Sequence, residues 1–138
     1  MNKILVDTNI LVYSIDQDSK YHRASSSLLT SENKIFIAAK CLSEFYAVVT
    51  RAPVVSLSAS EALQMVRWFS ENFTILFPEH NSLSTLMQLS EKYQPRGLKI
   101  HDFEIISIGL AHKIKRLATF NKKDFAAVEE IELVELTG

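Results

Sequence analysis

The sequence predicts an α/β protein, a three-layer α/β/α sandwich in which helices cover both faces of a mostly parallel central sheet. Short aliphatic and β-branched runs of strand length alternate with longer segments of helical periodicity along the whole chain. The 138 residues include only three Gly and three Pro, and no linker, repeat or low-complexity segment divides them. We therefore expect one domain over residues 1–138.

The first half of the chain is expected to hold two strand–helix units. The run Ile4-Leu5-Val6 is typical of a buried strand, and it stops at Asp7-Thr8-Asn9, whose polar side chains can cap a helix. The sequence then predicts a helix from Arg23 to Leu29, a strand from Lys34 to Ile37, and a mostly apolar helix from Ala38 to Arg51 that Pro53 ends.

The second half begins with a specific helix-start signal. Ser58 and Glu61 have the spacing of a capping box, in which each side chain bonds the other residue's backbone N–H, so a helix should run from there to about Phe69. The later elements are a strand over 73–77 stopped by Pro78, a helix from about Ser82 to Tyr93, a break at Pro95-Arg96-Gly97, a helix from Asp102 to Lys115, and strands over 117–120 and 132–136.

Composition excludes several classes of protein. A hydrophobic content of 47% is too high for intrinsic disorder, and a formal charge of −1 provides no global positive field for nucleic acid or an anionic membrane. The single cysteine, Cys41, cannot form an internal disulfide, which favours a reducing compartment. The N-terminal apolar run is interrupted at Asp7, and no stretch approaches the ~20 apolar residues of a membrane span. We expect a cytoplasmic protein that does not associate with membranes.

Three acids stand at positions where an ordinary core would not place them. Asp7 follows the first strand, at the end of the sheet where α/β proteins hold ligands, although it can also be a helix N-cap. Glu44 is the lone acid of an apolar helix and, if that face is inward, needs a cation or several donors; an exposed helix edge would remove this need. Asp102 shares the apolar stripe of its helix with Ile105 and Gly109, or simply interacts with the helix N-terminus.

A second polar group follows the fourth predicted strand. Thr119 and Asn121 lie on the same side of an extended segment, and Asp124 comes shortly after. Asn121 and Asp124 can also make a plain turn, and Lys122 and Lys123 a solvated edge. Their position at the carboxyl end of another strand favours a place in the same site.

Oxygen ligands that converge at strand ends suit a hard cation. Mg²⁺ and Mn²⁺ are held by carboxylates together with substrate phosphate, and the ion would supply the positive charge that the composition lacks. None of the four histidines has metal-ligand spacing to another, and His101, beside Asp102, is the one that can orient a ligand by a hydrogen bond.

Four short motifs occur here in one order, and together they resemble those of the PIN-domain ribonucleases, particularly the VapC-like toxins of bacterial and archaeal toxin–antitoxin pairs. The motifs are Asp7-Thr8-Asn9, Ser43-Glu44-Phe45, Gly97-Leu98-x-x-x-Asp102 and Thr119-x-Asn121-x-x-Asp124-Phe125. The resemblance implies a parallel sheet between helices, with Asp7, Glu44 and Asp102 as metal ligands or metal-positioning groups of an acidic pocket. It also implies a homodimer and a small antitoxin that covers the pocket.

Two departures from the family pattern leave the number of bound metals open. Phe103 follows the third acid, where members often carry a small residue, and the amide Asn121 occupies the fourth acidic position.

The resulting expectation is a metal-dependent endoribonuclease. Asp7 and Asp102 would bind Mg²⁺ or Mn²⁺, Glu44 would hold a second cation or the attacking water, and Asn121 and Asp124 would orient groups through water. Residues that would support the site or contact the RNA backbone are Thr8, Asn9, Thr119, Lys122 and Lys123.

Three other functions remain open at the level of the sequence. A haloacid-dehalogenase-like phosphatase also carries an Asp after its first strand, but it usually has a second Asp where this chain has Asn9. A non-catalytic PIN-like module would bind RNA or a protein through the same scaffold. A DNA-directed nuclease is the third, because composition does not distinguish the two polymers.

Overall fold

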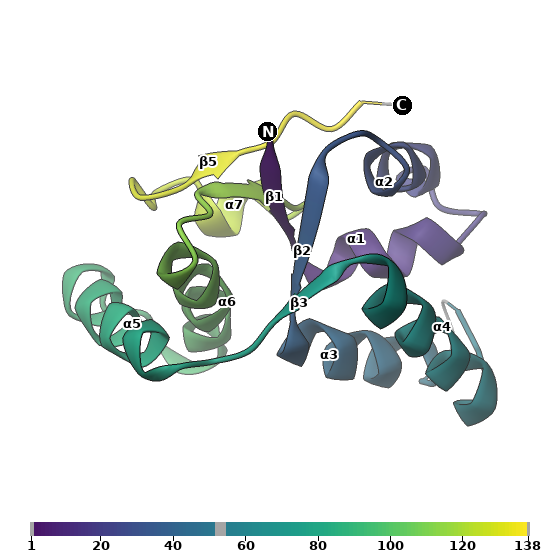
Figure 1. Cartoon of the computed structure of the whole chain (residues 1–138), viewed down its shortest axis with the longest axis horizontal. Helices are drawn as coiled ribbons and strands as arrows, with labels where there is room; N and C mark the ends of the chain where they lie inside the picture. Colours follow the sequence, from purple (N-terminus) through teal and green to yellow (C-terminus); the bar gives the residue numbers. More distant parts are fainter. Residues whose placement is uncertain (1, 52–54, 138) are drawn as a thin grey trace.

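The computed structural model describes residues 2–51 and 55–137, and within them the chain forms a three-layer α/β/α sandwich (Figure 1). The central sheet has the strand order β3-β2-β1-β4-β5, and each neighbouring pair is parallel, which confirms the predicted fold class. The strands are β1 (Lys3–Val6), β2 (Lys34–Ala38), β3 (Thr74–Leu76), β4 (Arg116–Ala118) and β5 (Glu132–Leu133).

Helices cover the two faces of the sheet in two groups. The first group comprises α1 (Thr8–Ile15), α2 (His22–Leu29), α3 (Ala39–Val49) and α4 (Ala59–Asn72). The second comprises α5 (His80–Tyr93), the 3₁₀ helix η1 (Gly97–Lys99), α6 (Ile100–Ala111) and α7 (Lys122–Phe125). In Figure 1, α5 and α6 lie to the left of the strands, and α1, α2 and α4 lie to the right. This division follows from right-handed crossovers that first extend the sheet toward β3 and then return to β4.

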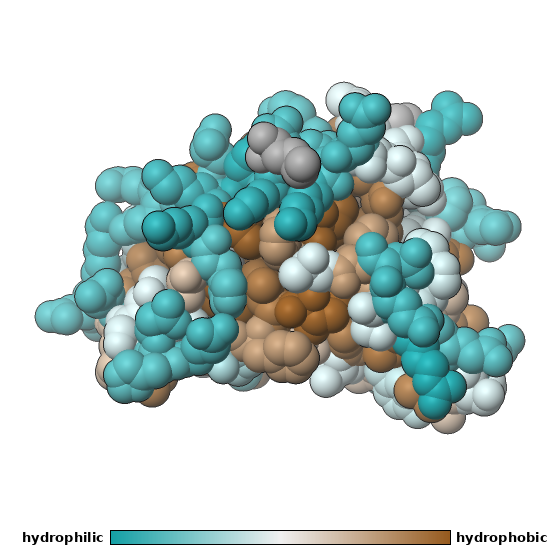
Figure 2. Space-filling view, viewed as in Figure 1, coloured by the Kyte–Doolittle hydropathy of each residue, from teal (hydrophilic) through white to brown (hydrophobic). Residues whose placement is uncertain are grey.

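The central strands are almost continuously buried. All residues of β1 after Lys3 and all residues of β2 after Lys34 are inaccessible to solvent, as expected for a parallel sheet covered on both faces. In the view of Figure 2, hydrophobic residues gather in the middle of the molecule and hydrophilic residues surround them. None of the helices in the described residues is long and apolar enough to span a membrane.

Several element boundaries differ from those predicted. The capping box of Ser58 and Glu61 is present, and α4 runs three residues past the predicted Phe69. Helix α6 begins at Ile100 and ends at Ala111, four residues before Lys115, because Lys113 adopts a left-handed backbone with φ of 61°. The N–H of Ile114 then bonds the Gly109 carbonyl at 2.9 Å and closes the helix end.

Two further differences concern the end of the chain and its middle. The segment after Asn121, for which a plain turn was one alternative, forms the short helix α7, and β5 has two residues rather than the five predicted. Pro53, which the sequence marks as the end of the third helix, lies outside the described residues, whereas α3 itself ends at Val49.

Gly109 is the point where α6 approaches β1 most closely. A Cβ on this residue would lie 2.8 Å from Cδ2 of Leu5 and 3.4 Å from the carbonyl oxygen of Ile114. We expect Gly109→Ala to lower the free energy of unfolding by about 1–3 kcal/mol, because overpacking a tight core contact forces side chains or backbone to shift. Urea unfolding measures this change, and a variant as stable as the parent would show that Leu5 rotates away without cost.

Candidate active site

A cleft of about 300 Å³ opens at the carboxyl edge of the sheet. Strand β1 lies between β2 and β4, so the order of the strands reverses at β1: β2 and β3 extend the sheet on one side of it, and β4 and β5 on the other. Open α/β sheets bind ligands at the carboxyl ends of the strands beside such a reversal. Six residues singled out from the sequence line this cleft: Asp7, Thr8, Asn9, Glu44, Asp102 and Asn121.

Asp7 is held in place by the end of β4 and by the start of α1. Because Val6 pairs with Ala118, Asp7 and Thr119 are the next residues of two adjacent strands. The Asp7 N–H donates to the Ala118 carbonyl at 3.0 Å, its Oδ1 accepts from the Thr8 N–H at 2.8 Å, and its Oδ2 accepts from the Thr119 hydroxyl at 2.9 Å. Asp7 is therefore both the N-cap of α1 and a wall of the cleft.

Burial dominates the electrostatics of Asp7. The residue is only 8% exposed, and this loss of solvation raises the pKa of its carboxyl above the ordinary value of 3.8. The hydrogen bonds from Thr119 and Thr8 lower the pKa in part, and the charges of Asp102 and Glu44 raise it again. The fold thus places a carboxylate where a cation would be stabilising.

Thr119 and Asn9 orient Asp7, and Asn9 also lines the cleft. The Thr119 hydroxyl donates a hydrogen bond to Asp7. It accepts hydrogen bonds from the Asn9 side-chain amide at 3.1 Å and from the Asn121 N–H at 3.0 Å. The Asn9 amide oxygen accepts from the Phe120 N–H at 3.3 Å. This network joins the ends of β1 and β4 and fixes one rotamer of Asp7.

Glu44 brings a buried carboxylate oxygen into the cleft from α3. Its Oε1 is inaccessible to solvent and has no hydrogen-bond partner among the residues that the structure describes. Burial raises the pKa of the neighbouring Cys41 thiol to about 12, so in the metal-free chain this thiol is protonated. A buried carboxylate oxygen without a donor requires a cation or water, which agrees with the sequence argument for Glu44.

Asp102 lies in the first turn of α6 and forms an ion pair with Lys99, which also pairs with Asp124. Lys99 Nζ lies 3.5 Å from Asp102 Oδ2 and 3.6 Å from Asp124 Oδ1. Burial raises the pKa of Asp102, the Lys99 charge lowers it, and the Asp124 charge raises it. The Asp124 side chain is 54% exposed and does not line the cleft, so Asp124 is joined to the site only through Lys99.

The remaining sequence-predicted residues lie farther from the cleft. The side chain of Lys122 is 3.9 Å from Glu135, toward the C-terminal segment, and Lys123 is exposed. His101, expected to orient a ligand, instead contacts Lys40 through Nδ1 at 2.9 Å, while Lys40 also pairs with Glu104 at 2.6 Å. Glu104 is thus an ion-pair partner of Lys40.

Sequence reasoning missed two residues with polar side chains at this site, and the apolar Val12 and Val48, which also line the cleft. Tyr13 lines the cleft because it lies one helical turn after Asn9, and Lys99 meets Asp102 because it lies three residues before it. Helical spacing from the acids would have found both residues.

The donor set fits a hard cation that is also bound by substrate and water. The available ligands are carboxylate and amide oxygens, and the buried Glu44 Oε1 lacks a partner. Across the described residues, no three His, Cys, Asp or Glu side chains are gathered closely enough to form a ready-made metal cage. Mg²⁺ and Mn²⁺ do not require such a cage, since they retain waters and bind substrate phosphate jointly with one or two carboxylates.

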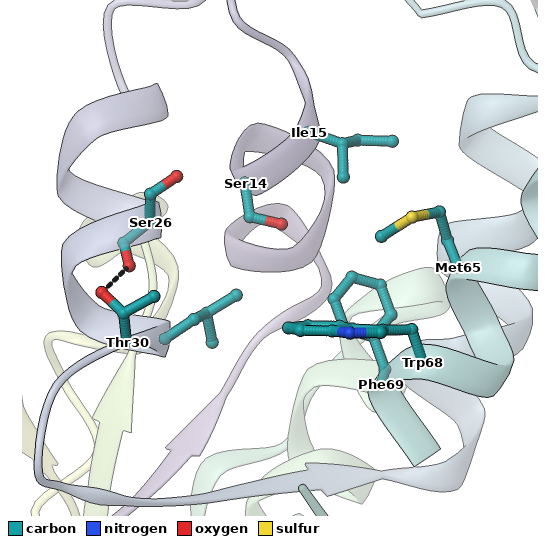
Figure 3. Close-up of a pocket in the computed structure, with 8 residues that line it drawn as sticks. Ser14, Ile15, Ser26, Thr30, Met65, Trp68 and Phe69 are labelled. Atoms are coloured by element: carbon teal, nitrogen blue, oxygen red, sulfur yellow. Dashed lines mark hydrogen bonds between the residues drawn. The ribbon is translucent and has the colours of Figure 1, made fainter. Parts of the chain in front are cut away.

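A second cleft, of about 250 Å³, has a different character. Figure 3 shows Ser14 and Ile15 of α1, Thr30 at the end of α2, and Met65 and Trp68 of α4 around an apolar space. Trp68 is 46% exposed there, which is high for such a large apolar side chain. This cleft has no charged side chains, so it suits apolar contacts rather than catalysis.

Comparisons with known proteins give one consistent result. A family model of the PIN domain matches residues 4–131. The chain is similar in structure to VapBC2 from Rickettsia felis bound to a promoter DNA fragment, with a TM-score of 0.75, 20% identity, and coverage of 98% of this chain and 99% of that one. VapBC-1 from nontypeable Haemophilus influenzae gives a TM-score of 0.72, 16% identity, and coverage of 96% and 97%.

A third similar structure is a sarcin-ricin loop cleaving VapC toxin from Mycobacterium tuberculosis, with a TM-score of 0.71, 12% identity, and coverage of 91% of this chain and 95% of that one. A comparison with curated protein sequences gives no match.

Proposed function

The chain belongs to the PIN-domain family, and from this premise we propose that it is the toxin of a toxin–antitoxin pair, an endoribonuclease that requires Mg²⁺ or Mn²⁺. The observation that carries the proposal is the cleft in which Asp7, Glu44 and Asp102 face one space at the carboxyl edge of the sheet. The similar structures, which include a toxin described as cleaving the sarcin-ricin loop and toxin–antitoxin complexes, support it.

Each acid has a distinct part in the proposed reaction. Asp7, fixed by Thr8 and Thr119, and Asp102, at the start of α6, hold the cation. When bound, that ion lowers the pKa of water and stabilises the charge that develops on the phosphodiester. Glu44, whose Oε1 has no hydrogen-bond donor among the described residues, would orient the attacking water and accept its proton as the new O–P bond forms. The P–O bond to the leaving oxygen breaks in the same step, and that oxygen takes a proton from solvent water. Asn121, at the cleft wall, positions the substrate by hydrogen bonds.

The direct test is incubation of the purified protein with total RNA and, separately, with single-stranded DNA, in Mg²⁺, Mn²⁺ or excess EDTA. We expect RNA fragments only with a divalent cation and none from Asp7→Asn. RNA that stays intact under every condition would favour the non-catalytic module, and cleavage confined to DNA would change the substrate assignment.

Lys122 and Lys123 are proposed to contact the RNA backbone beside the cleft. Replacing both with Ala should raise KM and reduce the dependence of log KM on log salt by about one unit of slope per lost phosphate contact, without changing the fold. Lys115→Ala is the matched control, because Lys115 is exposed and precedes β4, at the opposite edge of the sheet. An unchanged slope in the double variant would assign both lysines to a solvated edge.

We also propose that an antitoxin binds this chain and that its apolar side chains occupy the cleft of Figure 3. Tagged protein from the native cells should elute with a small second polypeptide that inhibits cleavage, and Trp68→Ser should lose that polypeptide while it still cleaves RNA. Trp68 is the only tryptophan, so its fluorescence should shift to shorter wavelength in the complex. Elution of the unmodified chain alone would contradict the proposal.

A homodimer is proposed on the opposite side of the molecule. Leu83 and Met87 lie one turn apart on α5 and are 53% and 58% exposed, which offers an apolar surface to a second copy. Light scattering should give twice the chain mass, and Leu83→Glu combined with Met87→Glu should give the mass of one chain.

A further inference from the structure

Lys99 places a positive charge among three oxygens at the edge of the acid cleft. Its Nζ lies 3.5 Å from Asp102 Oδ2 and 3.6 Å from Asp124 Oδ1, and it donates a hydrogen bond to the backbone carbonyl of Asp124. The ring of Phe125 lies on another side, with its centroid 5.6 Å from Nζ. The ammonium thus makes one hydrogen bond to a carbonyl and ion pairs with two carboxylates.

Two segments far apart in the sequence build this arrangement. Lys99 ends η1 and Asp102 lies in the first turn of α6, three residues later, so both point to the same side. Asp124 belongs to α7, which starts four residues after β4 ends and packs Phe125 into the core. The ammonium therefore bridges two acids that lie in successive connections of the sheet, Asp102 between β3 and β4 and Asp124 between β4 and β5.

From this geometry we infer that Lys99 is a built-in cation, which occupies the position where Asp102 and Asp124 would otherwise hold a second divalent ion. The cleft then binds a single divalent ion, at the ligands Asp7 and Asp102 proposed above. The inference rests on the proposed function, because it concerns the cation of that same site. It also answers the question that the family resemblance leaves open, namely how many metals are bound.

Charge and geometry both support this assignment. Asp102 and Asp124 repel each other, and the positive charge of Lys99 relieves that repulsion. A divalent ion at the same place would first have to lose part of its hydration shell, a cost that Lys99 does not have. A divalent ion at the same oxygens would face the ammonium at short range and would have to displace it. The Lys99 side chain is 32% exposed, compared with 48% for Lys92, whose ion pairs with Glu129 and Glu130 lie on the open surface.

Metal stoichiometry tests the inference without measuring cleavage. Mn²⁺ is titrated into the purified chain, and free Mn²⁺ is followed by its electron paramagnetic resonance signal. We expect one bound ion per chain for the unmodified protein and two for Lys99→Met, which keeps the length of the side chain but removes its charge. Lys99→Arg, which keeps the charge, and Lys122→Met, which removes a lysine from the same region, should each bind one ion.

The outcomes separate the inference from the function on which it rests. One ion in both the unmodified chain and a folded Lys99→Met, with Lys99→Gln in agreement, would overturn the inference and leave the proposed nuclease intact. Two ions in the unmodified chain would also overturn it. If the unmodified chain binds no Mn²⁺, the inference and the proposed metal dependence both fail. Circular dichroism of each variant confirms that the stoichiometries refer to folded protein.

Discussion

Asp7→Asn or Asp102→Asn is expected to lower the rate of RNA cleavage about 100-fold or more, the scale seen when one electrostatic contact to a transition state is removed. The amide oxygen can keep the hydrogen bond from the Thr8 N–H, but the amide NH2 cannot accept from the Thr119 hydroxyl, and the amide cannot supply the negative charge that a hard cation requires. The measurement is a time course of RNA cleavage in Mg²⁺ or Mn²⁺, at equal concentrations of folded protein.

The control for this result is Asp18→Asn, which removes an exposed acid from the connection between α1 and α2 and should cleave at the parental rate. Folded Asp7→Asn that cleaves RNA as fast as the parent in excess EDTA would rule out the metal nuclease. Loss of activity in Asp7→Asn together with loss of its helical circular dichroism would point instead to its role as the cap of α1.

The second large effect concerns stability and its dependence on pH. Burial raises the pKa of Asp7 above its unfolded value of 3.8, so the folded chain retains a proton that the unfolded chain has lost. Asp7 should therefore contribute less stability to the metal-free protein as pH rises from about 4 through its higher folded pKa. Asp102, whose pKa burial also raises, adds to the same trend.

Asp7→Asn should remove this penalty, so the metal-free variant should melt no lower than the parent at pH 7. Its Asn side chain can still cap α1, which limits any structural cost. Asp7 is a cleaner probe than Asp102, because Asp102→Asn also breaks the ion pair with Lys99. Thermal melts of the parent and of Asp7→Asn from pH 4 to pH 8 measure the effect, and a difference between their melting temperatures that stays constant over that range would contradict it.

Added metal should reverse the penalty. An ion at about 100 times its Kd stabilises the fold by about 2.7 kcal/mol, which for a chain of this length raises the melting temperature by roughly 10 °C. Asp7→Asn and Asp102→Asn should each gain much less, because each lacks one ligand. If Asp102 only interacts with the helix N-terminus, its replacement by Asn would leave the metal-induced shift unchanged.

Local signals in the sequence predicted most of the elements because those signals act over a few residues. The buried run of β1 and the capping box of α4 are examples, and each depends on the chemistry of neighbouring side chains. The end of α6 shows where such signals stop. Lys113 adopts a left-handed backbone that residues other than Gly and Asn rarely take, so the sequence pattern continued the helix to Lys115.

The sequence by itself determined the fold class, the family and the positions of Asp7, Glu44 and Asp102 on their elements, because residue periodicity and motif order are properties of the chain. Only the tertiary structure decided what each acid meets there. The hydrogen bond from Thr119 to Asp7 joins residues 112 positions apart, and Lys99 bridges Asp102 and Asp124. The fold also buries the Glu44 oxygen without a hydrogen-bond partner among the described residues. Such contacts depend on strand register and on how crossovers return to the sheet, and no local pattern encodes either.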